Sequence, residues 1–260
     1  MLERAGRLRV VLVGTSNPLN IGAAARAMSN FGFLHLRVVN PYNVAFREAR
    51  SAVGAAALLE NAEEFTSVAD AVADCTLVVG TTAVRHRELH HPLYRLEQGA
   101  RLIRKKLASG RVALLFGTEK TGLSNDDLSH CHWLMRIPTR EQHISMNLGQ
   151  AVAVCLYELV RDAKATRVVV SKSGERGGKK SATEGTGKPA TAGEVERISA
   201  VLLEALHLSG YINSIAAAST EERVRRMVRR MDLSSKDAEL WLGMLRQMLW
   251  KIRHPENSHR

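Results

Sequence analysis

Four short apolar runs, each followed by a turn that contains glycine or proline, constrain the fold of this chain more than any other feature. They occupy residues 9–13, 35–39, 76–79 and 111–116. Continuous apolar runs of this length are typical of strands that are buried on both faces, and helical patterns separate them in this sequence. Strands that alternate with helices predict an α/β fold, in which helices cover both faces of a parallel sheet.

Residues 133–160 hold the strongest helical signal. A fifth apolar run, residues 133–137, ends at Pro138, and a polar segment then leads into a helix from about Asn147. One face of this helix has apolar residues at helical spacing, namely Leu148, Ala151, Val152, Cys155 and Leu159. Asn147 followed three residues later by Gln150 fits a capping box. On its own, the pattern is also that of an ordinary connection between a strand and a helix.

The charge of the chain predicts a polyanionic partner. With 37 Lys and Arg against 26 Asp and Glu, its 260 residues carry a formal net charge of +11. An excess of this size favours binding to nucleic acid, although a solvated basic surface would produce the same composition.

The three cysteines indicate the redox state of the compartment in which the protein is found. Cys75, Cys131 and Cys155 lie in or beside apolar runs without paired spacing, as buried thiols in a reducing compartment do. The cluster of His130, Cys131 and His132 does not predict a metal site, because adjacent residues on an extended segment point to opposite sides. Since we find neither an apolar run of membrane-spanning length nor a signal-peptide pattern, we expect a cytoplasmic protein without membrane contact.

The last third of the chain predicts a separate module. Residues 171–193 lose almost all apolar side chains, so this segment cannot bury enough surface to offset the cost of ordering and is expected to be a flexible linker. Three helices follow, at about residues 195–208, from a cap formed by Ser219 and Glu222, and at about residues 235–252. We therefore expect an α/β domain, a linker and a small all-α module at residues 1–165, 166–193 and 194–260.

Arginines dominate one face of the second helix of this module. They suit contacts to RNA phosphates, but a solvated amphipathic helix shows the same pattern, and the sequence leaves both interpretations open. These residues are Arg223, Arg225, Arg226, Arg229 and Arg230.

Glycine-containing loops mark the candidate site. Gly14, Gly80 and Gly117 follow the first, third and fourth apolar runs, and open parallel sheets bind ligands beyond the carboxyl ends of their strands. Residues 117–122 have the spacing of a phosphate-binding P-loop, but Leu123 replaces the lysine that such a loop requires. Since no GxGxxG motif follows a strand either, nucleotide hydrolysis and ordinary dinucleotide binding are both disfavoured.

A second candidate segment runs from Asn20 to Arg26. Asn20 can cap a helix, Gly22 permits close approach, and Arg26 lies one turn further on the same face. A planar guanidinium at this place suits the binding of a phosphate group. The same sequence would also arise if the arginine only extended into solvent from an alanine-rich helix, and the two interpretations are equally compatible with it.

Three motifs in a fixed order give the chain a family resemblance. They are NxGxxxR at Asn20, Gly22 and Arg26, LLFGTEKTGLS at residues 114–124, and IPTREQHISMNLGQAVAV at residues 137–154. The combination resembles the SpoU/TrmH branch of the SPOUT RNA 2′-O-methyltransferases, and the opening and the tail of the chain look most like the TrmJ group.

The resemblance implies a trefoil knot at the carboxyl end of the α/β domain, an obligate homodimer, and S-adenosylmethionine as the methyl donor. It implies tRNA as the substrate, with the ribose of nucleotide 32 as the target. A ribosomal RNA substrate and a catalytically silent RNA-binding homologue remain the alternatives.

The resemblance also implies which residues form the site. Arg26 of one subunit would meet cofactor bound by the other and contact the RNA, as a positioning group or as a general base. Asn20 and Ser145 would support the reaction, and Arg85 and Arg87 would contact RNA. The expected cofactor contacts are Thr81, Thr82, Ala83, Gly117, Ile137, Ile144, Ser145 and Met146.

Overall fold

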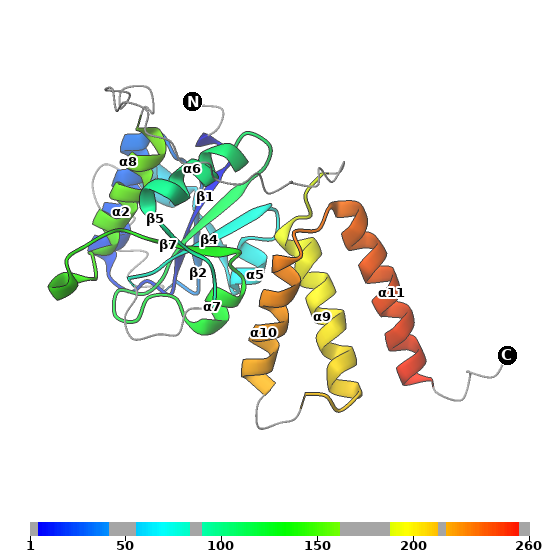
Figure 1. The fold of residues 1–260 in the computed structure, drawn as a ribbon. Coiled ribbons are helices and arrows are strands. Elements are labelled where there is room, and N and C mark those ends of the chain that lie inside the picture. Colours follow the sequence, from blue (N-terminus) through cyan, green and yellow to red (C-terminus); the bar gives the residue numbers. More distant parts are fainter. Residues whose placement is uncertain (1–4, 42–55, 84–89, 162–187, 213–216, 255–260) are drawn as a thin grey trace, which may run out of the picture.

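A seven-stranded parallel sheet forms the centre of the first part of the chain (Figure 1). The computed structural model describes residues 5–41, 56–83, 90–161, 188–212 and 217–254. The strand order is β3-β2-β1-β6-β4-β7-β5, and every pairing is parallel. The strands are β1 (Leu8–Val13), β2 (Leu36–Val39), β3 (Glu63–Phe65), β4 (Leu77–Thr81), β5 (Leu93–Arg95), β6 (Val112–Phe116) and β7 (Trp133–Arg136). The predicted parallel sheet is confirmed.

Both edges of the sheet are short strands that the sequence did not predict. β3 and β5 have three residues each, and their side chains are exposed or half-buried. Edge strands need no continuous apolar run, because they are not covered on both sides, so the pattern that identified the central strands is missing from them.

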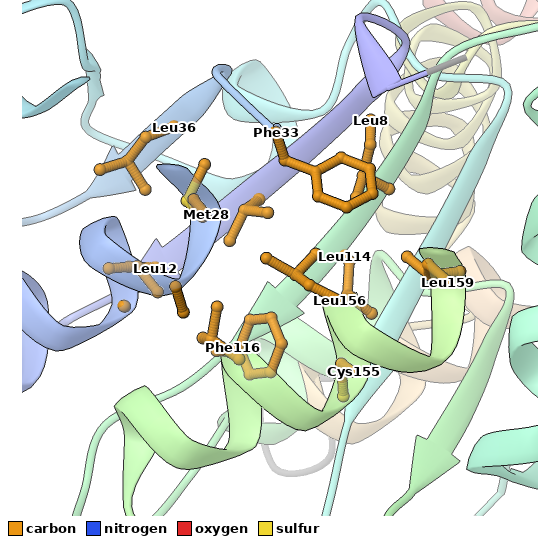
Figure 2. Close-up of a cluster of buried hydrophobic side chains, with 14 of the residues drawn as sticks. Leu8, Leu12, Met28, Phe33, Leu36, Leu114, Phe116, Cys155, Leu156 and Leu159 are labelled. Atoms are coloured by element: carbon orange, nitrogen blue, oxygen red, sulfur yellow. The ribbon is translucent and has the colours of Figure 1, made fainter. Parts of the chain in front are cut away.

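Side chains of the central strands alternate between two cores. On β1, Leu8, Val10 and Leu12 point to one face of the sheet, and Val11 and Val13 point to the other. Figure 2 shows the first core, where side chains from β1 and β6 pack against two long helices. The helices that contribute to this core are α2 (Pro18–Phe31), α4 (Ala56–Glu60), α6 (Leu96–Lys106) and α8 (Leu148–Val160). The second core includes α5 (Val68–Ala71) and α7 (Asn125–Ser129), so helices cover both faces as expected.

Helix α8 begins where the sequence predicted. The Asn147 side chain accepts the backbone N–H of Gln150 at 3.3 Å, which is the half of a capping box that the N-cap residue supplies. Leu148, Val152 and Cys155 are buried on its inner face. Gly149 allows the close packing of α8 on α2, since a Cβ at this position would lie 2.5 Å from the Cβ of Ala23.

Helix α2 begins earlier than expected, and its cap is a different residue. The side chain of Asn17 accepts the N–H of Leu19 at 3.0 Å, and Pro18 occupies the first helical position, which its fixed φ favours. The prediction that Asn20 caps the helix was therefore wrong. Asn20 lies in the first turn, where its side chain is available for other contacts.

The last part of the chain forms a three-helix module with its own core. Its helices are α9 (Ala192–Leu208), α10 (Ala217–Arg230) and α11 (Ser235–Arg253). Ser234 caps α11, whereas Ser219 lies inside α10 rather than at its cap, which corrects that prediction. Residues 162–187, which hold most of the expected linker, and the helical pattern at residues 46–53 lie outside the described residues. The expected domain boundaries thus stay predictions.

Contacts in two regions, around α5 and around α7, fix the module to the α/β domain. The N–H groups of Ala192 and Gly193 donate to the carbonyl groups of Cys75 and Ala73, at 2.7 and 2.9 Å. The Ala192 side chain is buried in the second core of the sheet. Figure 1 shows the start of α9 beside α5.

The second contact is made by Arg229 of α10, which pairs with Glu196 of α9 and also reaches Ser129 and His130 at the end of α7. Arg229 is only 3% exposed, and its Nη2 donates to Oε2 of Glu196 at 2.8 Å and to Nδ1 of His130 at 3.1 Å. Its Nε donates to the carbonyl group of Ser129, at the end of α7. Arg229 therefore holds the module in place instead of facing a ligand.

Two more of the five arginines on α10 are also committed within the chain. Arg225 pairs with Glu196 and Asp126, and Arg226 pairs with Glu222. Arg223 and Arg230 are exposed, so the expected basic face is narrower than the sequence suggested.

His130 and His132 have different partners, because His130 still has helical backbone angles at the end of α7 and His132 lies beyond it, just before β7. His130 contacts Arg229, whereas Nδ1 of His132 accepts the N–H of Val78 at 3.1 Å. Burial lowers the pKa of His132 to about 3. In the described ranges we find no group of residues placed to hold a metal ion, and no helix long and apolar enough to cross a membrane.

Asp74 lies between Ala73 and Cys75, the two residues that accept from the start of α9, and its carboxylate makes the stability of the fold depend on pH. Asp74 accepts from Arg37 at 2.5 and 3.1 Å and pairs with Arg111 at 3.1 Å. Burial alone would raise the pKa of Asp74, but the hydrogen bonds and charge of Arg37 outweigh it and lower the pKa from 3.8 to about 2. The folded state therefore binds fewer protons than the unfolded state in this range. The stabilisation is complete above pH 4 and is lost as the pH falls toward 2.

We expect Asp74→Asn to lower the free energy of unfolding by about 2 kcal/mol at pH 6. The difference from the wild type should shrink as the pH falls from 4 to 2, because the wild-type carboxylate becomes protonated there. Urea unfolding at a series of pH values measures it, with Glu64→Gln, an exposed residue of β3, as the control. A difference that stays constant down to pH 2 would contradict the assignment.

Candidate functional site

A cavity of about 510 Å³ opens at the carboxyl ends of three neighbouring strands. Its walls are the loops that follow β4, β6 and β7, residues 81–83, 116–123 and 137–147. The last loop contains a short 3₁₀ helix, η1 (Glu141–His143), and leads into α8. This is the place where open parallel sheets bind ligands, and a volume of this size suits a small molecule.

The residues expected to touch a cofactor all line this cavity. They come from three separate segments of the chain, and the fold brings them together as Thr81, Thr82, Ala83, Gly117, Ile137, Ile144, Ser145 and Met146. Asn20 also lines it. Their role toward a cofactor stays a prediction, but their convergence on one cavity is what that prediction requires.

Backbone groups form much of the wall after β6. Thr118 and Gly122 exchange two backbone hydrogen bonds, at 3.2 and 2.9 Å, which close the loop tightly on itself. Gly117 lies under this closure, where a Cβ would be 2.1 Å from the carbonyl carbon of Gly122. Glycine is thus required for steric reasons at position 117.

The wall after β4 is held by its neighbours in the sheet. The hydroxyl group of Thr81 donates to the carbonyl group of Leu115 at 2.8 Å, and the N–H of Thr82 donates to the carbonyl group of Met135 at 3.0 Å. Leu128 of α7 and Met135 of β7 supply apolar side chains to the same cavity. Among the described residues its lining is therefore mostly neutral, with Glu119 and Lys120 as the charged ones.

A chain of hydrogen bonds joins the three sequence motifs at the edge of the cavity. Nδ2 of Asn147 donates to Oδ1 of Asn20 at 2.7 Å, and Nδ2 of Asn20 donates to Oε1 of Glu119 at 3.2 Å. The same Glu119 oxygen accepts the N–H of Asn17 at 3.3 Å. These contacts fix the orientation of the Asn20 amide, because its oxygen accepts and its nitrogen donates.

Glu119 is a residue at the edge of the cavity to which the sequence reasoning gave no role. Asn147 was predicted to cap α8 and to belong to the third motif, but its contact with Asn20 was not predicted. No local signal marks Glu119, because an exposed carboxylate next to Lys120 needs no partner within the chain.

Arg26 and the other expected RNA contacts lie elsewhere. Arg26 is on the exposed side of α2, six residues or about 9 Å along the axis from Asn20, and it does not line the cavity of its own chain. Arg85 and Arg87 lie outside the described residues.

Comparison with known proteins agrees with this geometry. Residues 7–157 match the model of the SpoU rRNA Methylase family. The chain is 34% identical to the tRNA (cytidine/uridine-2′-O-)-methyltransferase TrmJ of Sodalis glossinidius, over 96% of this chain and 92% of the relative. It is 33% identical to the tRNA (cytidine/uridine/adenosine-2′-O-)-methyltransferase TrmJ of Pseudomonas aeruginosa, over 92% of each chain.

A solved structure shows the same similarity in three dimensions. The crystal structure of TrmJ from Z. mobilis ZM4 aligns with a TM-score of 0.77 at 30% identity, and covers 92% of this chain and 98% of that one. The similarity thus extends beyond the α/β domain to the helical module. By its sequence motifs, its parallel sheet and the loops around its cavity, the chain belongs to the SpoU rRNA Methylase family.

Proposed function

We propose that this protein is an S-adenosylmethionine-dependent methyltransferase that modifies a ribose 2′-hydroxyl of tRNA. The observation that carries the proposal is the convergence of three separate motifs on one neutral cavity at the carboxyl ends of β4, β6 and β7. Relatives that match nearly the whole chain are named tRNA 2′-O-methyltransferases. The net charge of +11 suits an RNA substrate.

The cavity fits the proposed cofactor. Its volume is sufficient, its apolar walls include Leu128 and Met135, and polar backbone groups flank Gly117. A cluster of cations would oppose a sulfonium group, and of the described residues that line the cavity only Lys120 carries a positive charge. When bound, S-adenosylmethionine supplies an electrophilic methyl group. The residues proposed to hold it are Thr81, Thr82, Ala83, Gly117, Ile137, Ile144, Ser145 and Met146.

We assign Arg26 to the RNA and to the cavity of a second subunit. An arginine side chain has donors but no acceptor atom, so Arg26 suits a phosphate contact that positions the ribose hydroxyl better than it suits a general base. Arg26 lies outside the cavity of its own chain, and a homodimer would allow it to reach the cavity of the partner. Most of the rate enhancement would then come from orientation of the hydroxyl.

Asn20 and Ser145 are proposed to support the reacting groups from the cavity wall. Arg85 and Arg87 are proposed to contact the RNA. The proposed target is nucleotide 32 of tRNA, and the trefoil knot remains part of the proposal as well. A ribosomal RNA target or a silent RNA-binding role would be the alternative functions.

Transfer of labelled methyl groups from S-adenosylmethionine tests the function. Unmodified total tRNA and ribosomal RNA serve as parallel substrates, and nuclease mapping locates the label. We expect label on the ribose of tRNA nucleotide 32. Label only in ribosomal RNA would show that ribosomal RNA, and not tRNA, is the substrate. Binding of cofactor without any label in either RNA would favour the silent homologue.

We expect Glu119→Gln to lower kcat about 10-fold while the cofactor Kd changes little. The carboxylate accepts from both Asn17 and Asn20, and hydrogen bonds to a charged acceptor are stronger than those to an amide. Single-turnover kinetics and calorimetric cofactor binding measure the two quantities. Lys120→Gln, the next residue of the same loop, is the matched control, and equal losses of kcat in both variants would argue against a specific role of Glu119.

A further inference from the structure

The outer face of α11 carries apolar side chains that no part of the described chain covers. Leu240 is 63% exposed, Met244 is 41% exposed and Met248 is 57% exposed. They follow one another at intervals of four residues, so they form a continuous row along the helix. The opposite side of α11 is already occupied, because Ala238, Leu245 and Leu249 are buried against the rest of the module.

The row is symmetric about Met244. Leu240 precedes it by four residues and Met248 follows it by four. Asp237 precedes it by seven residues and Lys251 follows it by seven, and helical geometry places both close to the same face. The face thus reads acidic, apolar, apolar, apolar, basic over about 21 Å of helix.

Such an order is complementary to itself when reversed. If a second α11 lies antiparallel to the first, Met244 meets Met244, Leu240 meets Met248, and Asp237 meets Lys251 at both ends. A parallel pair would instead bring Asp237 to Asp237 and Lys251 to Lys251, which is repulsive. Asp237 and Lys251 therefore favour a second α11 as the partner, in the antiparallel direction.

We infer that α11 is a self-association helix, which pairs with the α11 of a second copy of this chain in an antiparallel, two-fold symmetric contact. A two-fold contact uses the same surface on both partners, as this palindromic face does. Figure 1 shows α11 at the outer edge of the molecule, beside α9 and away from α2 and α8. The contact is thus separate from the cavity and from Arg26, and it does not depend on the proposed methyl transfer.

The area of this face sets the strength of the contact. Two helices that meet over about 21 Å bury less than the roughly 1,200 Å² that stable complexes need, so α11 alone gives a weak and concentration-dependent association. It would join chains, or homodimers formed through another surface, into larger assemblies.

Cysteine crosslinking of the full-length chain tests the geometry. The three native cysteines are buried, so an introduced surface cysteine reports on α11 alone. We expect Met244→Cys to form a disulfide-linked dimer in most of the protein under mild oxidation, because two-fold symmetry brings this position to itself. Arg246→Cys, which is exposed on another face of the same helix, should stay at the background level of the wild type.

The direction of pairing has its own readout. Leu240→Cys and Met248→Cys should not crosslink when each is alone, but a mixture of the two variants should form the mixed dimer. Asp237→Lys should reduce the crosslinking of Met244→Cys several-fold, and adding Lys251→Asp should restore it. Thermal melting of each variant confirms that the fold is intact.

Two results would overturn the inference. Equal crosslinking of Met244→Cys and Arg246→Cys would mean random collision, and background crosslinking of Met244→Cys in a folded protein would mean that α11 does not pair. Crosslinking of Leu240→Cys and Met248→Cys each to itself would show a parallel contact and would exclude the proposed one.

Discussion

Arg26→Ala should lower kcat for RNA methylation by about 10²–10³-fold, the size of effect seen when one positioned charge or donor is removed from a transition state. The affinity for S-adenosylmethionine should stay near the wild-type value, since Arg26 does not line the cavity of its own chain. Single-turnover methyl transfer and calorimetry on the same protein preparations separate these two effects. Ser29→Ala, which changes another exposed residue of α2, is the control.

A mixture of two inactive variants tests whether Arg26 acts on the partner subunit. Ile144→Trp should fill the cavity from its rim and abolish cofactor binding, while leaving Arg26 intact. If Arg26 acts in trans, a mixed dimer of Arg26→Ala and Ile144→Trp contains one complete site, and random mixing should recover about a quarter of wild-type activity. No recovery in a verified mixed dimer would place Arg26 in its own subunit's site, and near-normal turnover of Arg26→Ala alone would remove it from the mechanism.

Gly117→Ala should have the largest effect on both the fold and the cofactor. The new Cβ would lie 2.1 Å from the carbonyl carbon of Gly122 and 2.2 Å from the nitrogen of Leu123, and both are backbone atoms that cannot rotate away. The loop must open to accept it, so the free energy of unfolding should fall by about 3 kcal/mol and cofactor affinity by at least about 100-fold. Urea unfolding and calorimetric binding measure the two losses.

Gly122→Ala is the matched control in the same loop. Gly122 has a φ of +71°, but a Cβ at this position meets no atom within 4 Å. Its replacement carries only the cost of a left-handed backbone, about 1 kcal/mol. If Gly117→Ala binds cofactor as well as Gly122→Ala does, the closed loop is not part of the cofactor site.

The sequence predicted the parts of the fold that depend on local pattern. Continuous apolar runs identify the central strands, because a strand that is covered on both faces leaves no polar side. The helical spacing of Leu148, Val152 and Cys155 identifies the buried face of α8. The edge strands β3 and β5 are not buried on both faces, so no continuous apolar run marks them in the sequence. A knot depends on the path of the whole chain, which no local pattern describes, so the proposed trefoil knot rests on the family resemblance alone.

The candidate site, like the fold, was predictable from the sequence only in part. The loops at strand ends and the motif residues indicate where the cavity lies, because the carboxyl ends of parallel strands meet at one edge. Glu119 pairs with Asn20, and Arg229 donates to the carbonyl group of Ser129. Both contacts join segments that are about 100 residues apart in the sequence. Sequence shows charge and amphipathic pattern, but it does not show which acceptor a given arginine will find.

The strand order has a consequence for how the protein is made. β1 is an inner strand of the sheet, yet its neighbour β6 lies far along the chain, with Leu8 paired to Val112. A ribosome that adds about 5–20 residues per second needs roughly 5–20 s to synthesise the intervening segment. For that time the nascent β1 has one edge of unpaired N–H and C=O groups and two faces of apolar side chains, which is the state in which unpaired strands aggregate. Co-translational chaperone binding to the first hundred residues, rather than the stability of the finished sheet, should therefore limit the yield of this protein.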